Sequence, residues 1–415
     1  MEPSLKLRGR LPQTTDRPHF LEEDRKMVAK KRERGLLLLS VAIAISAVVL
    51  TSSSGEAAGR KIRFITLHSF NGKDGVSPNC LLMDGKGNFY GTCGDGGIYI
   101  RIKYSGGYGS IFKLDPNGNF VTLHSFDGSD GGSPNCLLMN GKGNFYGTCG
   151  DGGEYGFGTV FKLVPNGNLI TLHIFRDGRW PDSLIMNSYG NLYGTTGGGG
   201  KHFAGTIFKL APDGVLTTLH NFNSKDGEGP WTLISDDRGN LYGTTNQGGI
   251  HGDGVIFKLA PDGVLTTLYS FNKIDGNWPE ALIIDKQGNL YGTTYMGGAH
   301  GDGTIFKLAT DGALTTLHNF NVMEGQGHHY LIIDNQGILY GTTPKGGASG
   351  HGTVFKLAPD GTFTTLHSFN GKDGARPYAL IMDRHGNLYG VTYRGGANND
   401  GTIFEIKGAA TPNNG

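Results

Sequence analysis

The sequence has no excess of charge, little proline and only one long apolar run, and each shortage excludes a class of protein. Its 37 Lys and Arg balance 36 Asp and Glu, so no basic surface is expected for nucleic acid. Sixteen prolines in 415 residues are too few for collagen or a Pro-rich disordered chain. The apolar run, 36–50, is 15 residues long, which is short for a membrane span of about 20 residues. We therefore expect no membrane contact beyond a signal peptide.

Glycine is the one residue type in clear excess. The chain holds 72 glycines, more than twice the usual share of about 7%. Because each glycine inside a helix costs about 0.5–1 kcal/mol, a helix-rich protein is excluded. Hydrophobic residues at 37% and aromatics at 10% leave enough material for a core. The composition therefore predicts many short strands joined by turns.

The first 58 residues have the pattern of an export signal. Basic residues within 30–34 precede the apolar run 36–50, and small residues follow up to Ala58. This order is that of a secretory signal peptide, although an uncleaved anchor fits the same residues. Met27 would begin a signal of ordinary size, so the residues before it are expected to be a spurious extension. We expect the protein to be periplasmic, or secreted and extracellular.

A unit of about 49 residues recurs seven times between residues 63 and 407. Its phrase Ile-Phe-Lys-Leu, or a close variant, has its phenylalanine at Phe112, Phe161, Phe208, Phe257, Phe306, Phe355 and Phe404. Each unit contains four predicted strands, which in the fourth copy are Pro230–Asp236, Asn240–Thr245, Val255–Ala260 and Val264–Phe271. Glycine-bearing tight turns join the first strand to the second and the third to the fourth. Four strands per unit predict one blade of a β-propeller.

The two ends of the array predict a closed ring. The array begins with an isolated fourth strand, Arg63–Phe70, and ends with an isolated set of three strands, Tyr378–Lys407. Neither is a complete blade, but together they make one, and closure removes exposed sheet edges. We therefore expect an all-β fold over residues 59–407, a seven-bladed β-propeller with four strands per blade. Its last blade would be closed by the N-terminal strand, and residues 408–415 would form a disordered tail.

The repeated unit resembles a known family. It reads P-x-x-L-I-x-D-x-x-G-N-L-Y-G-T-T and then G-G-x-x-G-x-G-T-I-F-K-L-A-P-D-G-x-L-T-T-L-H-x-F. Over residues 63–407 it is similar to the Gloeo/Verruco tandem repeat of secreted bacterial proteins. That resemblance implies export and a propeller-like array, and it brings no established activity or catalytic residue. Through P-x-x-L-I-x-D-x-x-G-N-L-Y the unit also resembles propellers of the NHL, gluconolactonase and streptogramin-lyase kind.

The four cysteines form two matched pairs. Cys80 and Cys93 lie in the first and second strands of the first blade, and Cys136 and Cys149 occupy the same places in the second. The other five copies have cysteine at neither position. Because the two positions face each other across the predicted hairpin, we expect disulfides Cys80–Cys93 and Cys136–Cys149 in an exported chain. Free buried thiols and a four-cysteine metal site are the alternatives.

Residues shared by all copies are needed by every blade, so we interpret them as structural. The loop from each fourth strand to the next first strand carries one acid: Asp74, Asp130, Asp177, Asp226, Asp275, Glu324 and Asp373. A glycine follows each acid, which favours a turn role, and a cation or sugar-hydroxyl site is the alternative. The mid-strand histidines of the fourth strands are likewise expected to pack and hydrogen-bond. No metal site is assigned, but calcium is possible, with candidate ligands Asp226, Asp253, Asp275 and Asp302. No other cofactor is expected.

The copies differ most in aromatic residues at one face. The hairpin turns share one end of the blades, so the longer connections share the opposite end, here called the loop face. All three tryptophans lie beside the proline that opens the first strand of blades three to five. We expect them at the mouth of the central channel, where aromatic faces suit a sugar; packing between blades is the alternative. The candidate ligand-binding residues are Trp180, Trp231, Trp278, Tyr295, His328, His329, Tyr330, Tyr378 and Tyr393.

Two classes of function remain open. The first is a secreted binding module for carbohydrate, or for another extracellular polymer or protein, and a structural surface or adhesion protein overlaps with it. The second is a propeller-type hydrolase or lyase, for instance a lactonase. No Ser/His/Asp or Cys/His arrangement stands out, and the first strands are apolar, so no catalytic residue is assigned. We favour the binding module and expect a monomer.

Overall fold

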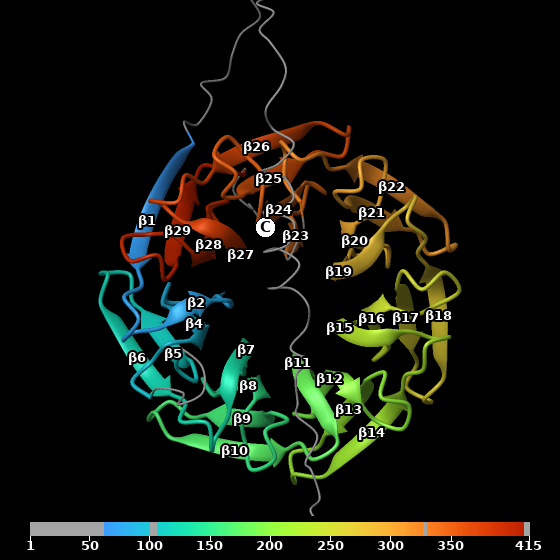
Figure 1. The fold of residues 1–415 in the computed structure, drawn as a ribbon, viewed down its shortest axis with the longest axis horizontal. Coiled ribbons are helices and arrows are strands. Elements are labelled where there is room, and N and C mark those ends of the chain that lie inside the picture. The colour runs from blue at the N-terminus through green and yellow to red at the C-terminus, as the bar shows by residue number, and fades with distance from the viewer. Residues whose placement is uncertain (1–61, 100–105, 327–329, 411–415) are drawn as a thin grey trace, which may run out of the picture. The chain divides into compact units, whose positions relative to one another are not determined.

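Seven antiparallel sheets are arranged in a closed ring, with the first strand of each sheet towards the centre (Figure 1); the space at the centre is here called the channel. The computed structural model describes residues 62–99, 106–326 and 330–410. Within these residues all regular secondary structure is β-strand. The all-β, seven-bladed propeller predicted from the repeats is therefore confirmed. No helix in this described part is long and apolar enough to span a membrane. The predicted signal peptide lies outside the described residues.

Each blade runs from an inner first strand to an outer fourth strand. Blade one has β2 (Val76–Pro78) with β3 (Leu82–Met83), β4 (Phe89–Asp95), β5 (Ser110–Leu114) and β6 (Phe120–Ser125). Blade two has β7 (Gly132–Met139), β8 (Phe145–Asp151), β9 (Thr159–Leu163) and β10 (Leu169–Ile174). Blade three has β11 (Gly178–Met186), β12 (Leu192–Gly199), β13 (Thr206–Leu210) and β14 (Leu216–Asn221).

The other four blades repeat the same order. Blade four has β15 (Glu228–Ser235), β16 (Leu241–Gln247), β17 (Val255–Leu259) and β18 (Leu265–Ser270). Blade five has β19 (Asn277–Ile284), β20 (Leu290–Met296), β21 (Thr304–Leu308) and β22 (Leu314–Asn319). Blade six has β23 (Leu331–Ile333), β24 (Leu339–Thr343), β25 (Thr353–Leu357) and β26 (Phe363–Ser368). Blade seven has β27 (Ala375–Met382), β28 (Leu388–Arg394), β29 (Thr402–Lys407) and β1 (Arg63–Ser69).

The N-terminal strand closes the ring, as predicted. Strand β1 pairs antiparallel with β29, from Arg63 opposite Lys407 to Ser69 opposite Thr402. The ladder continues past β1, because the Phe70 amide donates to the Gly401 carbonyl at 3.0 Å. Blade seven is thereby built from both ends of the array. Strand β1, which leads into blade one, covers the edge of β29 that would otherwise be unpaired.

Buried phenylalanines form the core between neighbouring blades. In the fourth blade Phe257, the centre of Ile-Phe-Lys-Leu, is fully buried, and its ring lies 5.1 Å from that of Phe222. Gly243 of the second strand leaves room for this ring, since a Cβ there would overlap Phe257. The repeated motifs therefore reflect one packing arrangement, in which a glycine on the second strand makes room for a phenylalanine on the third.

A proline–glycine contact joins the first strand of every blade except the sixth to the blade before it. In blade five, Pro279 packs on Gly254, whose φ is +98°. The residue before the proline, Trp278, donates its amide to the Asp253 carbonyl at 3.1 Å. Trp278 has φ +58°, in the left-handed region that non-glycine residues seldom adopt. Backbone contacts thus hold the first strand against the preceding blade. These contacts determine where the side chains of the strand reach the channel.

The described part of the predicted tail packs against the last blade. Ala409 and Ala410 are buried in the hydrophobic cluster around Tyr340 and Phe404. The Ala410 amide donates to the Gly386 carbonyl at 3.0 Å. The prediction of disorder is therefore wrong for residues 408–410, because their small side chains fit beside the hairpin turn. Residues 411–415 lie outside the described part.

Candidate ligand site in the central channel

Equivalent positions of five first strands supply side chains to one cavity in the channel, and the residue at this position differs between blades. It is the residue that follows the first-strand proline, here called the channel position. In chain order the channel positions hold Asn79, Asn135, Asp182, Trp231, Glu280 and Tyr378. Blade six lacks this proline, and its corresponding residues 328 and 329 lie outside the described part. In blade two the channel residue lies in a β-bulge, where the register shifts between Pro134 and Leu137. Bulges redirect side chains, which explains how one residue per strand comes to face the channel.

A buried threonine in the second strand of the preceding blade fixes the backbone at five channel positions. Its hydroxyl donates to the carbonyl oxygen of the channel residue. The pairs are Thr92 with Asn135 (2.8 Å), Thr148 with Asp182 (2.7 Å), Thr195 with Trp231 (3.3 Å), Thr244 with Glu280 (3.3 Å) and Thr342 with Tyr378 (3.0 Å). All five threonines are fully buried. The same hydrogen bond therefore holds unlike side chains at equivalent points of the wall.

The channel contains a cavity of about 350 Å³. Its walls include Trp231, Tyr330 and Tyr378, together with Asp182 and the amides of Asn79 and Asn135. This volume lies at the lower end of the range for small-ligand pockets, about 300–1,000 Å³. Three aromatic residues and a carboxyl group around one cavity make a site that can stack on a ring and bind a polar group.

Asp182 stands apart from the amides at the equivalent positions. Asn79 donates to the Pro134 carbonyl at 2.9 Å and Asn135 to the Pro181 carbonyl at 2.7 Å, so each bridges to the next blade. A carboxylate has no proton to donate in this way, and no described residue hydrogen-bonds to the Asp182 side chain. Burial raises the pKa of Asp182 to about 7. This carboxyl therefore changes its charge near neutral pH.

Two tyrosines face Asp182 across the channel. The rings of Tyr330 and Tyr378 lie 5.6 Å apart. Burial raises the pKa of Tyr330, and the charge of Asp182 raises it further. Burial also raises the pKa of Tyr378 well above its ordinary value, with added effects from Tyr330, Asp182 and Glu280. Both phenols are therefore neutral at physiological pH.

The structure brings some of the predicted aromatic residues together and separates others. Trp231, Tyr330 and Tyr378 line the same cavity, whereas Trp278 lies against Tyr295 with ring centroids 6.0 Å apart. Trp180 is 49% exposed. Tyr393 contributes to the raised pKa of Tyr378, so it lies within electrostatic range of the channel. His328 and His329 lie outside the described residues. Ligand binding by this set stays a prediction.

The sequence reasoning missed the charged and amide members of the site. Glu280 is only 7% exposed and acts electrostatically on Tyr378, and Asp182 lines the cavity itself. The signal was present, because aligning the six copies that have the proline shows Asn, Asn, Asp, Trp, Glu and Tyr after it. The sequence prediction was based on the three tryptophans, and two of these precede the proline instead of following it. The position after the proline was therefore not recognised as variable.

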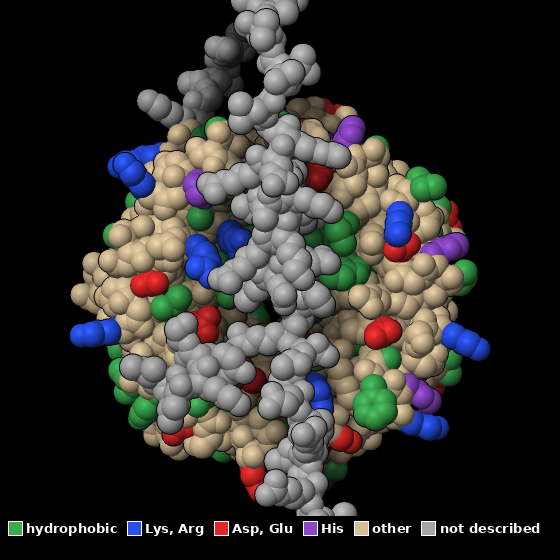
Figure 2. Space-filling view, viewed as in Figure 1, with side chains coloured by type: hydrophobic (Ala, Val, Ile, Leu, Met, Phe, Trp, Pro, Cys, Tyr) green, Lys and Arg blue, Asp and Glu red, His purple; other side chains and the backbone are tan. Residues whose placement is uncertain are grey.

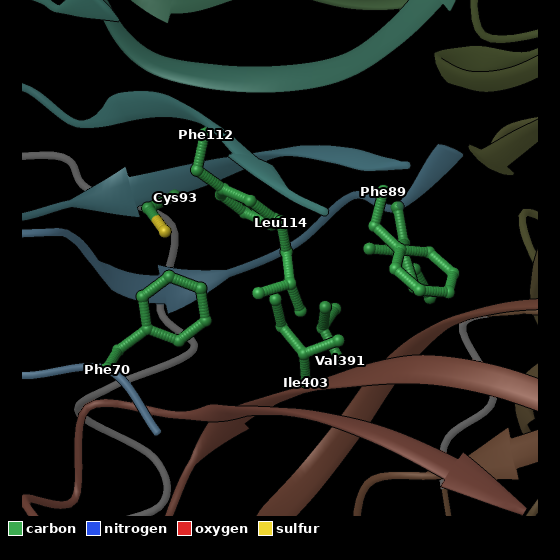
Figure 3. Packing of buried hydrophobic residues seen from close by; sticks show 9 residues of the cluster. Phe70, Phe89, Cys93, Phe112, Leu114, Val391 and Ile403 are labelled. Atoms are coloured by element: carbon green, nitrogen blue, oxygen red, sulfur yellow. The ribbon is translucent and has the colours of Figure 1, made fainter. Parts of the chain in front are cut away.

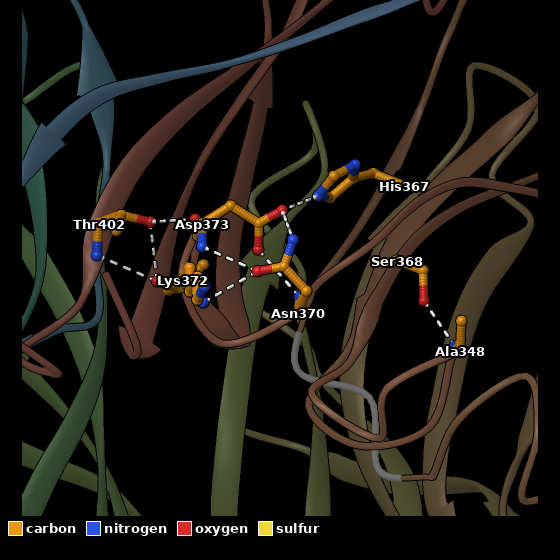
Figure 4. A network of polar contacts seen from close by, with 8 residues as sticks. Ala348, His367, Ser368, Asn370, Lys372, Asp373 and Thr402 are labelled. Carbon is orange, nitrogen blue, oxygen red and sulfur yellow. Dashed lines mark hydrogen bonds and ion pairs between the residues drawn. The ribbon is translucent and has the colours of Figure 1, made fainter. Parts of the chain in front are cut away.

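The acids between blades have a structural role, as interpreted from their recurrence. Asp373 accepts hydrogen bonds from the Asn370 amide at 2.9 Å and contacts His367 Nε2 at 3.1 Å (Figure 4). The same contact joins His68 to Asp74, His124 to Asp130, His220 to Asp226 and His318 to Glu324. Where tyrosine replaces histidine, the Tyr269 hydroxyl donates to Asp275 at 2.7 Å. Six of the seven acids thus close their loop onto the preceding outer strand.

The candidate calcium ligands are spread over different loops. Asp226 and Asp275 are engaged in the contacts just described, while Asp253 and Asp302 belong to the loops that precede β17 and β21. Among the residues that the structure describes, no three His, Cys, Asp or Glu side chains gather where they could hold a metal ion. Calcium binding stays a prediction without a defined site.

The predicted pairing of the cysteines is wrong. The disulfide joins Cys80 to Cys136, linking the first strands of blades one and two, with Cα atoms 5.0 Å apart. Cys93 and Cys149 are free and buried, and Figure 3 shows Cys93 among the rings of the core. The prediction assumed an unbroken hairpin register. A shift in register places Pro78, not Cys80, opposite Cys93, so Cys80 is free to reach the next blade.

A second hollow, of about 990 Å³, lies between blades two and three at the hairpin-turn end. Its walls are turn residues such as Asn140, Asn187 and Tyr189, with Lys142 and Lys162 beside them. Although it is larger than the channel cavity, its walls come from the turns that every blade repeats. The channel, where blades differ and a carboxyl has a displaced pKa, is therefore the better candidate site.

Replacing Asp182 with asparagine is expected to stabilise the fold at pH 8 and to change nothing near pH 3. The unfolded chain loses this proton near the ordinary pKa of 3.8, but the folded protein keeps it to about pH 7. Asp182 therefore destabilises the fold increasingly from pH 4 to 7, by up to about 4 kcal/mol. Because Asp182 is only partly buried, solvent screening reduces this effect and we expect about 1–2 kcal/mol. Urea unfolding at both pH values measures the difference.

The control is Asp237→Asn, which removes one negative charge from an exposed turn. It should give no pH-dependent gain. If Asp182→Asn lowers stability at pH 8, the carboxylate contributes hydrogen bonds that outweigh its burial, and the raised pKa is refuted.

Comparisons with known proteins agree with this architecture. The model of the Gloeobacter/Verrucomicrobia repeat matches residues 57–237, 175–327 and 211–404. Virginiamycin B lyase from Staphylococcus aureus has a similar fold, with a TM-score of 0.60 and 14% identity over 83% of this chain and 98% of that one. No curated protein matches the sequence.

Two further solved structures share the fold. The extracellular domain of a putative one-component system from B. thetaiotaomicron has a TM-score of 0.54 and 10% identity, over 82% of this chain and 39% of that one. A putative 6-phosphogluconolactonase from Bacteroides uniformis has a TM-score of 0.50 and 17% identity, over 72% of this chain and 88% of that one. At these identities the likeness is one of fold.

Proposed function

The chain belongs to the Gloeobacter/Verrucomicrobia repeat family, and from that premise we propose that it is a secreted binding module for carbohydrate or a cell-surface polymer. The observation that carries the proposal is the channel cavity, where Trp231, Tyr330 and Tyr378 stand around the Asp182 carboxyl. Aromatic faces stack on the apolar faces of sugar rings, and carboxyl and amide groups bind their hydroxyls. The loop face would admit the polymer to this cavity.

Export is part of the proposal. The basic, apolar and small-residue segments within residues 1–58 have the order of a signal peptide. The Cys80–Cys136 disulfide suits an oxidising compartment outside the cytoplasm. On the face seen in Figure 2, Lys and Arg side chains are dispersed among acids, and this arrangement offers a polyanion such as nucleic acid no continuous basic surface.

Changing Trp231 to alanine is expected to weaken glycan binding by up to about tenfold, because a stacked aromatic ring contributes about 0.5–1.5 kcal/mol. The measurement is a glycan-array screen of residues 59–415, followed by titration of the best glycan. Trp180→Ala and Trp278→Ala should weaken binding less, since these residues lie outside the cavity walls.

Tyr189→Ala is the matched control. Tyr189 is 84% exposed at the hairpin-turn end, so its loss should leave glycan binding unchanged. Equal binding by the Trp231→Ala variant would refute the proposed site, and the absence of any bound glycan would refute the carbohydrate function.

One observation favours a second function, a hydrolase or lyase. A carboxyl group with a pKa of about 7 is suited to general acid or base catalysis near neutral pH, and Asp182 faces two tyrosines in the cavity. Turnover of lactones or cyclic esters, abolished by Asp182→Asn, would shift the assignment from a binding module to an enzyme.

A further inference from the structure

The hollow of about 990 Å³ between blades two and three leaves apolar surface accessible that the other blades bury. Leu184 of β11 lines the hollow and is partly exposed. The equivalent leucines of the other six blades are each at most 4% exposed; they are Leu81, Leu137, Leu233, Leu282, Leu331 and Leu380. An accessible apolar floor beneath polar side chains is typical of ligand pockets.

The two blades beside the hollow also differ from the others at the head of the first hairpin turn. Five blades have aspartate there, whereas blades two and three have Asn140 and Asn187. In blade four the Asp236 Oδ2 atom accepts hydrogen bonds from the Asn240 side chain at 2.7 Å and from the Tyr242 hydroxyl at 3.2 Å. Blades one and seven make the same two contacts. The aspartate is thus the acceptor for two side-chain donors.

Blade two lacks this acceptor. The Oδ1 atom of Asn140 accepts the backbone amides of Lys142 and Asn144, both at 3.0 Å. This leaves the Nδ2 group of Asn140, a donor, at the place of the aspartate Oδ2. Neither that group nor the Asn144 side chain nor the Tyr146 hydroxyl donates to any described residue. All three residues line the hollow, so three side-chain donors there can take an acceptor from a ligand.

Two lysines line the hollow together with these donors. Lys162 lies over the ring of Tyr146, with its Nζ atom 5.8 Å from the ring centroid, and Lys142 is exposed in the turn. No Asp or Glu is among the described residues that line the hollow. Asp213, which lies between two lining residues, accepts the Val215 amide at 3.1 Å. Ammonium groups joined by neutral donors favour an oxyanion, because hydrogen bonds between charged groups are the strongest.

We propose that this hollow is a second binding site, which takes an oxyanion on a sugar: the carboxylate of a uronic acid or a sulfate ester. The oxyanion would take the place of the absent turn aspartate as the acceptor for Asn144 and Tyr146, and the sugar ring would lie on the floor at Leu184. The word sugar rests on the proposed function, whereas the oxyanion is argued from the donors alone. The site is separate from the channel, because Trp231 and Tyr378 are not among its walls.

The test is calorimetric titration of the full chain at pH 7 and low ionic strength with glucuronate, glucose 6-sulfate and glucose. We expect at least one anionic sugar to bind at least tenfold more tightly than glucose, and which one does so distinguishes the carboxylate from the sulfate ester. Asn140→Asp should remove that preference, because it returns the acceptor to Asn144 and Tyr146 and repels the ligand. Five blades carry aspartate at this position, so the variant should keep its unfolding midpoint. Lys142→Gln should weaken the anionic sugar about fivefold.

Lys86→Gln is the matched control, because Lys86 has the same turn position in blade one, behind Asp84. It should keep the full preference, and so should Trp231→Ala. Loss of the preference in Trp231→Ala would place the anion in the channel and overturn the inference. Full binding by Asn140→Asp, or equal binding of the three sugars, would overturn it too.

A fourth probe, inorganic sulfate, separates this inference from the proposed function. If sulfate binds, loses its affinity in Asn140→Asp, and no sugar binds at all, the oxyanion site is supported and the carbohydrate function is refuted. If glucose and other neutral glycans bind but neither sulfate nor an anionic sugar is preferred, the inference is overturned and the carbohydrate function stands.

Discussion

A chain from which residues 63–69 have been deleted is expected to lose its single cooperative unfolding transition. These residues are β1, the outer strand of blade seven, and without them the edge of β29 is unpaired. The deletion also removes Phe64, which stacks on Phe404 at 5.7 Å in the core of blade seven. The loss is comparable to the whole free energy of unfolding of a domain, about 5–15 kcal/mol, so the ring should open and aggregate through the exposed edge.

Scanning calorimetry and circular dichroism of the deleted chain measure this effect. The control is a peptide of residues 62–70 added in excess, which should restore the transition because it can occupy the vacant edge from outside the chain. An unchanged midpoint in the deleted chain would mean that six complete blades hold the seventh in place, and the closure argument would fail.

Replacing Gly254 with alanine is expected to destabilise the fold by about 3 kcal/mol. Gly254 has φ +98°, and an added Cβ would overlap the Thr245 carbonyl oxygen of its own blade and lie 2.6 Å from Cδ of Pro279, both closer than real Cβ contacts allow. The left-handed backbone costs an alanine about 1–2 kcal/mol, and forcing the blades apart adds about 1–3 kcal/mol. The substitution acts both within blade four, at Thr245, and at the contact with Pro279 of blade five, so the effect should appear as earlier unfolding of the whole ring.

The matched control for this prediction is Gly263→Ala. Gly263 has φ +88° but nothing lies within 4 Å of the Cβ position, so only the backbone term of about 1 kcal/mol applies. Midpoints of urea unfolding for the two variants give the difference directly. Equal losses would show that the proline–glycine contact has room to adjust and does not hold the blades together.

The fold could be predicted from the sequence because every blade repeats the same pattern of strands, turns and core residues. Glycine turns, the Phe of Ile-Phe-Lys-Leu and the glycine that accommodates it recur with one period, and the unmatched strand at Arg63 has a single possible partner, at the other end of the array. Such features depend on spacing, which a sequence displays. The predicted boundary of the tail was wrong because Ala409 and Ala410 are buried in the core but lie outside the repeat, so no periodic pattern marks them.

The site was harder to predict because it depends on a local break in that regularity. The register shift between Pro78 and Leu82 turns Cys80 towards Cys136, and the same kind of bulge in blade three directs Asp182 to the channel. When the register of a hairpin is counted outward from its turn, a bulge is missed, because no particular residue type marks the extra residue. The aromatic residues were found from their rarity, but the raised pKa of Asp182 comes from burial, which only the folded channel reveals.

The closing ladder also determines how the molecule responds to mechanical load. Because Arg63 lies opposite Lys407, the chain enters β1 and leaves β29 at the same end of the pair. Tension between the two flanking segments would therefore peel the strands apart one hydrogen bond at a time instead of shearing all of them together. The Cys80–Cys136 link lies outside this ladder and gives it no protection. A protein tethered through both ends would open at blade seven first.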